Sequence, residues 1–91
     1  MLANLLLLLA PVTPDAWRIL PAPVDVALAD DTVIQPDIVV APRADYTERD
    51  LPVAPLLAVE ILSPSTRLLD LHVKKDRLAR AGTRHYWVID P

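Results

Sequence analysis

Apolar residues fall into short runs along the chain, and the spacing within each run predicts its secondary structure. The first run, MLANLLLLLA, ends at Pro11 and predicts a helix over residues 1–12 that belongs to a hydrophobic core. Between residues 17 and 62, several short runs alternate in polarity or are rich in β-branched side chains, as strands are. Prolines separate these runs and break the chain often.

Two of the runs predict strands that are buried and carry one acid each. The segment 34–41 contains Ile38-Val39-Val40, which follows directly on Asp37. The segment 56–62 is apolar except for Glu60, a pattern typical of a central strand that is covered on both faces. Residues 43–55 between them are polar and charged, and they predict a surface loop with solvated acids.

A helix over residues 65–82 and a strand over residues 85–90 complete the pattern. The serines and threonine of 63–66 are expected to cap the helix, and Gly82 to end it. The apolar stripe of the helix comprises Leu68, Leu71, Leu78 and Ala79. A strand, a crossover helix and a second strand make a βαβ unit, so the fold class predicted is α/β with a mixed β-sheet.

Composition and charge narrow the possible functions. A chain of 91 residues fits one domain, and the absence of cysteine excludes disulfides, thiolate metal sites and cysteine nucleophiles, which favours a cytoplasmic location. The net charge of −3 does not favour nucleic-acid binding by the chain as a whole. However, residues 1–63 carry a net charge of −6 and residues 64–91 a net charge of +3, so the basic side chains are concentrated in the last third.

The leucine-rich start also admits a targeting segment or a membrane anchor as an alternative. Six of the first nine residues are leucine, but no basic residue precedes them. A membrane-spanning helix needs about 20 apolar residues, and this run ends at Pro11. We therefore expect no association with a membrane.

Asp37 and Glu60 are the candidate metal ligands, because each carboxylate lies in or beside a strongly apolar strand. Burial of an unpaired charge is costly, so such acids usually face a cation, a metal ion or a reacting group. Two acids from adjacent strands could hold Mg²⁺ or Mn²⁺, which take a few carboxylates and keep their waters. Salt bridges to nearby lysine or arginine side chains are the alternative.

Lys74 and Lys75 could provide an ammonium beside that site. On a helical wheel Lys75 falls within the apolar stripe, and Lys74 flanks it beside Leu71. An ion pair between Lys74 and Asp70, one turn apart, is the alternative. We expect His72 and His85 to lie at the surface.

The segments QPDIVVAP, LLAVEILSPSTR, DLHVKK and HYWVIDP together resemble the restriction endonuclease family also called Uma-two, within the PD-(D/E)XK nuclease superfamily. The resemblance runs from about Trp17 to Pro91. It implies a restriction-endonuclease-like mixed β-sheet with flanking helices, in which Asp37 and Glu60 bind the metal and are catalytic. The spacing D-x-x-x-K from Asp70 selects Lys74 as the catalytic lysine, with Lys75 as the substitute.

The chain also departs from the pattern of that family. The position two residues after the second acid, where the superfamily usually has lysine, is Leu62, and Leu78 stands where family members commonly have tyrosine. Members are longer at both ends and often carry an earlier acid, whereas no acid precedes Asp15 here. The chain is thus expected to be a single partial nuclease-like domain, with an incomplete sheet.

Two functions therefore follow as hypotheses. The first is a Mg²⁺-dependent endodeoxyribonuclease, whose DNA substrate meets the basic residues of the last third. The second is a non-catalytic gene fragment or interaction module of the same fold, which forms a homo-oligomer or whose sheet is completed by a partner.

Overall fold

The structure is a computed structural model that describes residues 2–91, so the first residue of the predicted 1–12 helix lies outside the described part. The mixed α/β class is confirmed, but the strands form two sheets where the sequence predicted one. The helices are α1 (Leu2–Leu9) and α2 (Leu68–Ala81), with short 3-10 helices η1 (Ala10–Val12) and η2 (Arg43–Asp45). The strands are β1 (Trp17–Pro21), β2 (Asp25–Ala29), β3 (Thr32–Ile34), β4 (Ile38–Pro42), β5 (Asp50–Leu51), β6 (Leu57–Ile61) and β7 (His85–Ile89).

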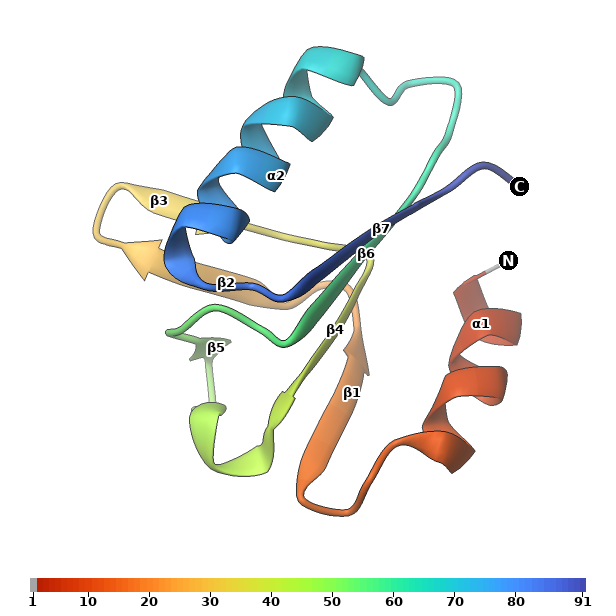
Figure 1. Ribbon diagram of the computed structural model, residues 1–91, viewed down its shortest axis with the longest axis vertical. Helices are drawn as coiled ribbons and strands as arrows, with labels where there is room; N and C mark the ends of the chain where they lie inside the picture. The colour runs from red at the N-terminus through yellow and green to blue at the C-terminus, as the bar shows by residue number, and fades with distance from the viewer. Residues whose placement is uncertain (1) are drawn as a thin grey trace.

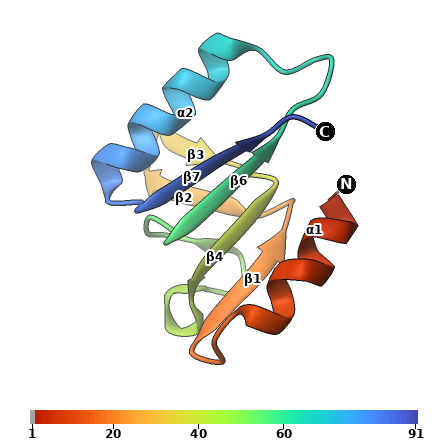
Figure 2. The ribbon, with the colours of Figure 1, turned by 45° about the vertical axis from the view of Figure 1, so that its right-hand side comes forward.

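The larger sheet has the strand order β1-β4-β6-β7 (Figure 2). β4 is antiparallel to both β1 and β6, whereas β7 is parallel to β6 and is reached through α2, as the βαβ pattern predicted. In the β4–β6 register, Ile38 lies opposite Val59. The position before Ile38 therefore faces the position after Val59, which brings Asp37 opposite Glu60.

The smaller sheet has the order β3-β2-β5 and lies partly in the segment predicted to be a surface loop. β2 and β3 form a hairpin, and β5 pairs with β2 in parallel. Leu51 in β5 is fully buried, and so is Pro55 after it, so these two side chains fasten the 43–55 segment to the core. The prediction of a surface loop missed β5 and these two buried side chains, because isolated apolar residues in a polar segment give no periodic pattern.

The main core lies between the larger sheet and a layer that α2 and the smaller sheet form together. Figure 1 shows α2 with β2 and β3 on one side of the larger sheet, and α1 on the other side. Side chains from the larger sheet, the smaller sheet and α2 form one buried cluster, which comprises Val26, Ile34, Val39, Ala41, Leu51, Ala58 and Leu78. Strand β6 lies between β4 and β7 and contributes Ala58 to this cluster, so it is an interior strand of the sheet, as its apolar sequence predicted.

Helix α1 is not the core helix expected from its leucines. It lies against β1, and none of its residues is buried. Leu7 and Leu8 are more than 70% exposed. One short helix beside an edge strand can turn only part of its surface toward the sheet, and leucine all round leaves the rest in water. Within residues 2–91, no helix has the length and apolar character needed to cross a membrane.

Helix α2 begins later than predicted and packs through fewer residues. It starts at Leu68, and its N-cap Arg67 makes no side-chain capping bond. The hydroxyls expected to cap it bond to the preceding turn instead: the N–H of Ser63 donates to Oγ1 of Thr66 at 2.9 Å. Leu71 and Leu78 are buried.

Leu68 and Ala79, the two ends of the predicted apolar stripe, are exposed, so the buried face of α2 is narrower than predicted. Leu68 is 73% exposed, and Ala79 is also exposed. Gly82 ends the helix as predicted, with a φ of 106° that other residues rarely adopt.

Candidate functional site

Asp37 is held by the backbone of the neighbouring strand. Its N–H donates to the carbonyl of Val59 at 2.9 Å, and its Oδ2 accepts from the N–H of Ile61 at 2.6 Å. β4 begins only at Ile38, so no carbonyl of that strand is paired with the N–H of Ile61, and the side chain takes that place. The carboxylate is therefore fixed beside the C-terminal end of β6, next to Glu60.

Glu60 is the one buried charged residue of the described chain, with 6% of its surface exposed. Its Oε1 accepts from Nζ of Lys74 at 3.3 Å, an ion pair between β6 and α2. Burial raises the pKa of the Glu60 carboxyl above its ordinary value; the Lys74 ammonium opposes that rise, and the negative charge of Asp37 adds to it. The two carboxylates are thus close enough for electrostatic repulsion between them.

The structure separates the two candidate lysines. Lys74 is half-buried and reaches Glu60, whereas Lys75 is exposed and lies in none of the described cavities, although the helical wheel placed it in the apolar stripe. The alternative ion pair of Lys74 with Asp70 does not form, since Glu60 takes the ammonium. The buried carboxylate is the stronger partner because water screens it less.

Asp37, Glu60 and Lys74 line one open cavity of about 260 Å³ between the C-terminal end of β6 and the start of α2. Two further charged side chains line it, Arg67 and Asp70. The sequence reasoning assigned neither of them to the site. Their spacing on the helix could have indicated it, because residues 67, 70 and 74 fall on one face at 3.6 residues per turn.

Tyr86 is a further polar group on this face of the sheet. It pairs in register with Ala58 in β6, two positions before Glu60, so it points to the same side of the sheet. Its hydroxyl is buried and has no hydrogen-bond partner in the described residues. Burial raises the pKa of Tyr86, and the charges of Glu60 and Asp37 raise it further, so the hydroxyl stays protonated.

The donor set suits a hard divalent cation. Each carboxylate uses one oxygen in the contacts given above, Oδ2 of Asp37 and Oε1 of Glu60, which leaves the second oxygen of each without a hydrogen-bond partner among residues 2–91. Residues 2–91 bring together no group of three acidic or histidine side chains. Mg²⁺ is commonly held by one or two carboxylates with waters and substrate phosphates, so two acids are enough for it.

The other candidate residues lie elsewhere. His72 and His85 are exposed, as expected. Ser63 and Ser65 line the cavity but are hydrogen-bonded to one another or to Thr66. The acids of the 43–55 segment lie outside the cavity.

The family model described as "Putative restriction endonuclease" (Uma2) matches residues 1–91. The chain therefore belongs to the Uma2 family of restriction endonuclease-like proteins, as its motifs indicated. This membership supports a nuclease-like function. A comparison with curated proteins gave no match.

A solved structure from Anabaena variabilis, described as "a putative nuclease belonging to DUF820", has a similar fold. The TM-score is 0.71 and the sequence identity 21%. The match covers 99% of this chain and 52% of the other, so this chain spans about half the length of that protein. The likeness supports a restriction-endonuclease-like α/β fold that is incomplete relative to this neighbour.

Proposed function

We propose that the chain is a metal-dependent endonuclease domain that hydrolyses phosphodiester bonds in DNA. The observation that carries the proposal is the convergence of Asp37, Glu60 and Lys74 on one open cavity, from the residue before β4, from β6 and from α2. A single carboxylate, that of Glu60, completes the ion pair with Lys74, so the carboxylate of Asp37 beside it is available as a metal ligand. Membership of the Uma2 family supports the same reaction class.

Asp37 and Glu60 would hold Mg²⁺ or Mn²⁺ through their free oxygens. A bound divalent ion supplies Lewis-acid polarisation of the phosphoryl group and neutralises its charge. The backbone of Ile61 orients Asp37, so this ligand is positioned before any ion arrives. Lys74 holds its ammonium at the cavity wall, where it stabilises negative charge that develops on the attacked phosphate.

The proposal is tested by incubating the purified chain with supercoiled plasmid in Mg²⁺ or Mn²⁺. We expect nicking that Asp37→Asn and Glu60→Gln abolish, and that Lys74→Met reduces by roughly 100-fold, the order expected when one charge-stabilising donor is removed. Glu48→Gln is the matched control, because this acid is exposed and lies outside the cavity. Cleavage that survives in both Asp37→Asn and Glu60→Gln would refute the assigned site.

A second candidate is a non-catalytic interaction module of the same fold. It is favoured by the open edge at β7, where Trp87 and Val88 are 43% and 45% exposed, and by the exposed leucines of α1. This candidate would be favoured over the first if the folded chain cleaves no plasmid in Mg²⁺ or Mn²⁺ and forms a stable complex with a partner.

A further inference from the structure

A groove continues from the candidate site along one flank of α2. The site cavity and its neighbour share Asp70 and Lys74, and the neighbour shares Thr32, Val73 and Arg77 with a third cavity. Arg67, Lys74 and Arg77 fall within about 80° of one another around the helix axis, since each residue turns about 100°. The three cavities therefore form one path along α2, which starts at the C-terminal end of β6 and continues between α2 and the β2–β3 hairpin.

The cations of this path differ in what they contact. Lys74 is paired with Glu60, and Arg80 is paired with Asp76 one turn earlier on the helix, with 3.1 Å between Nε and Oδ2. Arg67 and Arg77 have no acidic partner in the described part of the chain. Two full positive charges thus remain available, one at each end of the path.

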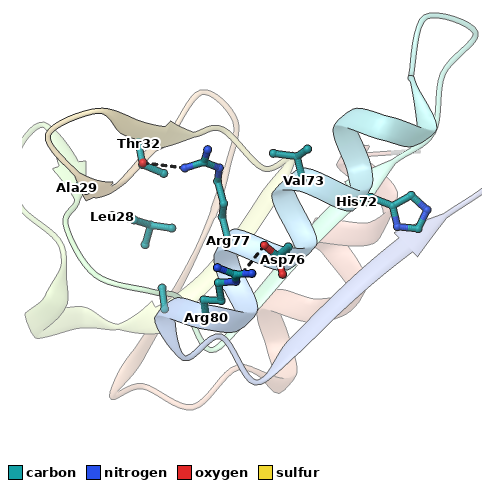
Figure 3. Close-up of a pocket in the computed structure, with 9 residues that line it drawn as sticks. Leu28, Ala29, Thr32, His72, Val73, Asp76, Arg77 and Arg80 are labelled. Carbon is teal, nitrogen blue, oxygen red and sulfur yellow. Dashed lines mark hydrogen bonds and ion pairs between the residues drawn. The ribbon is translucent and has the colours of Figure 1, made fainter.

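Figure 3 shows how Arg77 is held. Its side chain leaves α2 toward the hairpin, and its Nη1 donates to the hydroxyl of Thr32 at 3.0 Å. Thr32 is neutral and occupies one of the five guanidinium N–H donors, so the rest can bind an anion. Arg80 is bonded to Asp76 instead, and His72 points away from the hairpin.

We propose that Arg67 and Arg77 bind two backbone phosphates of a DNA strand that lies along this flank of α2, across the candidate site. Arg67 and Arg77 are ten positions apart, which corresponds to about 15 Å along the helix axis. In B-DNA one strand carries a phosphate every 3.4 Å of axis, so the arginines are about four nucleotide steps apart. This inference rests on the proposed function because it takes DNA as the substrate.

Lys75 provides the matched control for this inference. It is an exposed cation of the same helix that lies about 160° around the axis from Arg77, and it lies in none of the three cavities. Its removal changes the net charge as much as the removal of either arginine. A general electrostatic attraction would make the three substitutions equivalent, whereas a strand along the groove would not.

The test measures binding of the full chain to a fluorescent DNA duplex by anisotropy, in EDTA and over a series of salt concentrations. We expect Arg67→Gln and Arg77→Gln each to weaken binding roughly tenfold and to lower the salt slope by about 0.9, the value for one phosphate contact. Lys75→Gln should change affinity by less than about twofold. Equal effects of all three substitutions would overturn the inference.

Thr32→Val separates phosphate binding by Arg77 from a structural role in fastening the hairpin. It removes the hydrogen bond and leaves the charge, so we expect affinity near that of the unchanged chain; a loss equal to that of Arg77→Gln would overturn the role of Arg77. Cleavage that fails while the arginine dependence of binding persists would refute only the nuclease proposal. If the chain cleaves DNA but binding does not depend on the two arginines, only the proposed phosphate contacts of Arg67 and Arg77 are refuted.

Discussion

The protonation of Glu60 couples the candidate site to the stability of the fold. Burial raises the pKa of this carboxyl above 4.5, so the folded chain binds a proton more tightly than the unfolded chain does. The contribution of Glu60 to the free energy of unfolding is therefore full below pH 4.5 and is lost as the pH rises through the raised pKa. Glu60→Gln removes this ionisation.

We expect Glu60→Gln to become more stable relative to the unchanged chain as the pH rises from about 4.5 to 8. Lys74, which loses its partner, has a third of its side chain exposed and can be hydrated. Urea unfolding at several pH values measures the difference. A gap between the two chains that is independent of pH would show that Glu60 ionises in the fold as it does in water.

The Tyr86 hydroxyl gives a second prediction at the residue scale. It is buried without a partner, and an unsatisfied buried hydroxyl costs roughly 1–3 kcal/mol. Tyr86→Phe keeps the ring, so we expect thermal unfolding to show equal or slightly higher stability, by up to about 1 kcal/mol. A clear loss would mean that the hydroxyl has a hydrogen-bond partner in solution.

The two acids of the candidate site could be picked out of the sequence because a charged residue in or beside an apolar strand is unusual. A carboxylate in an apolar strand is visible in the sequence, as Asp37 and Glu60 were. The choice between Lys74 and Lys75 came from a family spacing, since both lie near the apolar stripe. Arg67 and Tyr86 could not be found in this way, because neither differs from its neighbours in the sequence; the start of α2 and the pairing of Tyr86 with Ala58 bring them near the site.

At the scale of elements, the end of α2 depends on a single glycine. Gly82 has a φ of 106°, and no atom lies within 4 Å of where a Cβ would be added, so the whole effect of a substitution comes from the backbone. We expect Gly82→Ala to lower the free energy of unfolding by about 1–2 kcal/mol. Gly82→Asn should lower the free energy of unfolding by less than Gly82→Ala does, because asparagine adopts the left-handed conformation more readily than alanine. Equal stability of all three chains by urea unfolding would contradict this account.

The strands and α2 were largely predicted from periodicity, whereas the pairing of the strands into two sheets was not. Period and β-branching reveal which segments are strands, but they do not show that β2, β3 and β5 leave the main sheet. The leucines of α1 predicted burial, although burial also requires an opposing surface that the described chain does not provide. The prediction that residues 63–66 cap α2 failed because the hydroxyl groups of this segment form hydrogen bonds within their own turn.

At the scale of the whole molecule, the larger sheet ends in an open strand. Within the part of the chain that the structure describes, β7 pairs only with β6, and an exposed strand edge can pair with a second copy of the chain. We expect light scattering to show association that increases with concentration and that Val88→Lys reduces. Val73→Lys is the control, since Val73 on α2 has the same exposed fraction, 45%. Equal association of both variants and the unchanged chain would exclude pairing at this edge.

The central claim is that Asp37 and Glu60 jointly hold one divalent ion, and Mn²⁺ binding followed by electron paramagnetic resonance tests it most directly. The account predicts one ion per chain, lost in both Asp37→Asn and Glu60→Gln and kept in Asp45→Asn, whose acid lies outside the cavity. An ion that stays bound with unchanged affinity in either of the first two variants would contradict it.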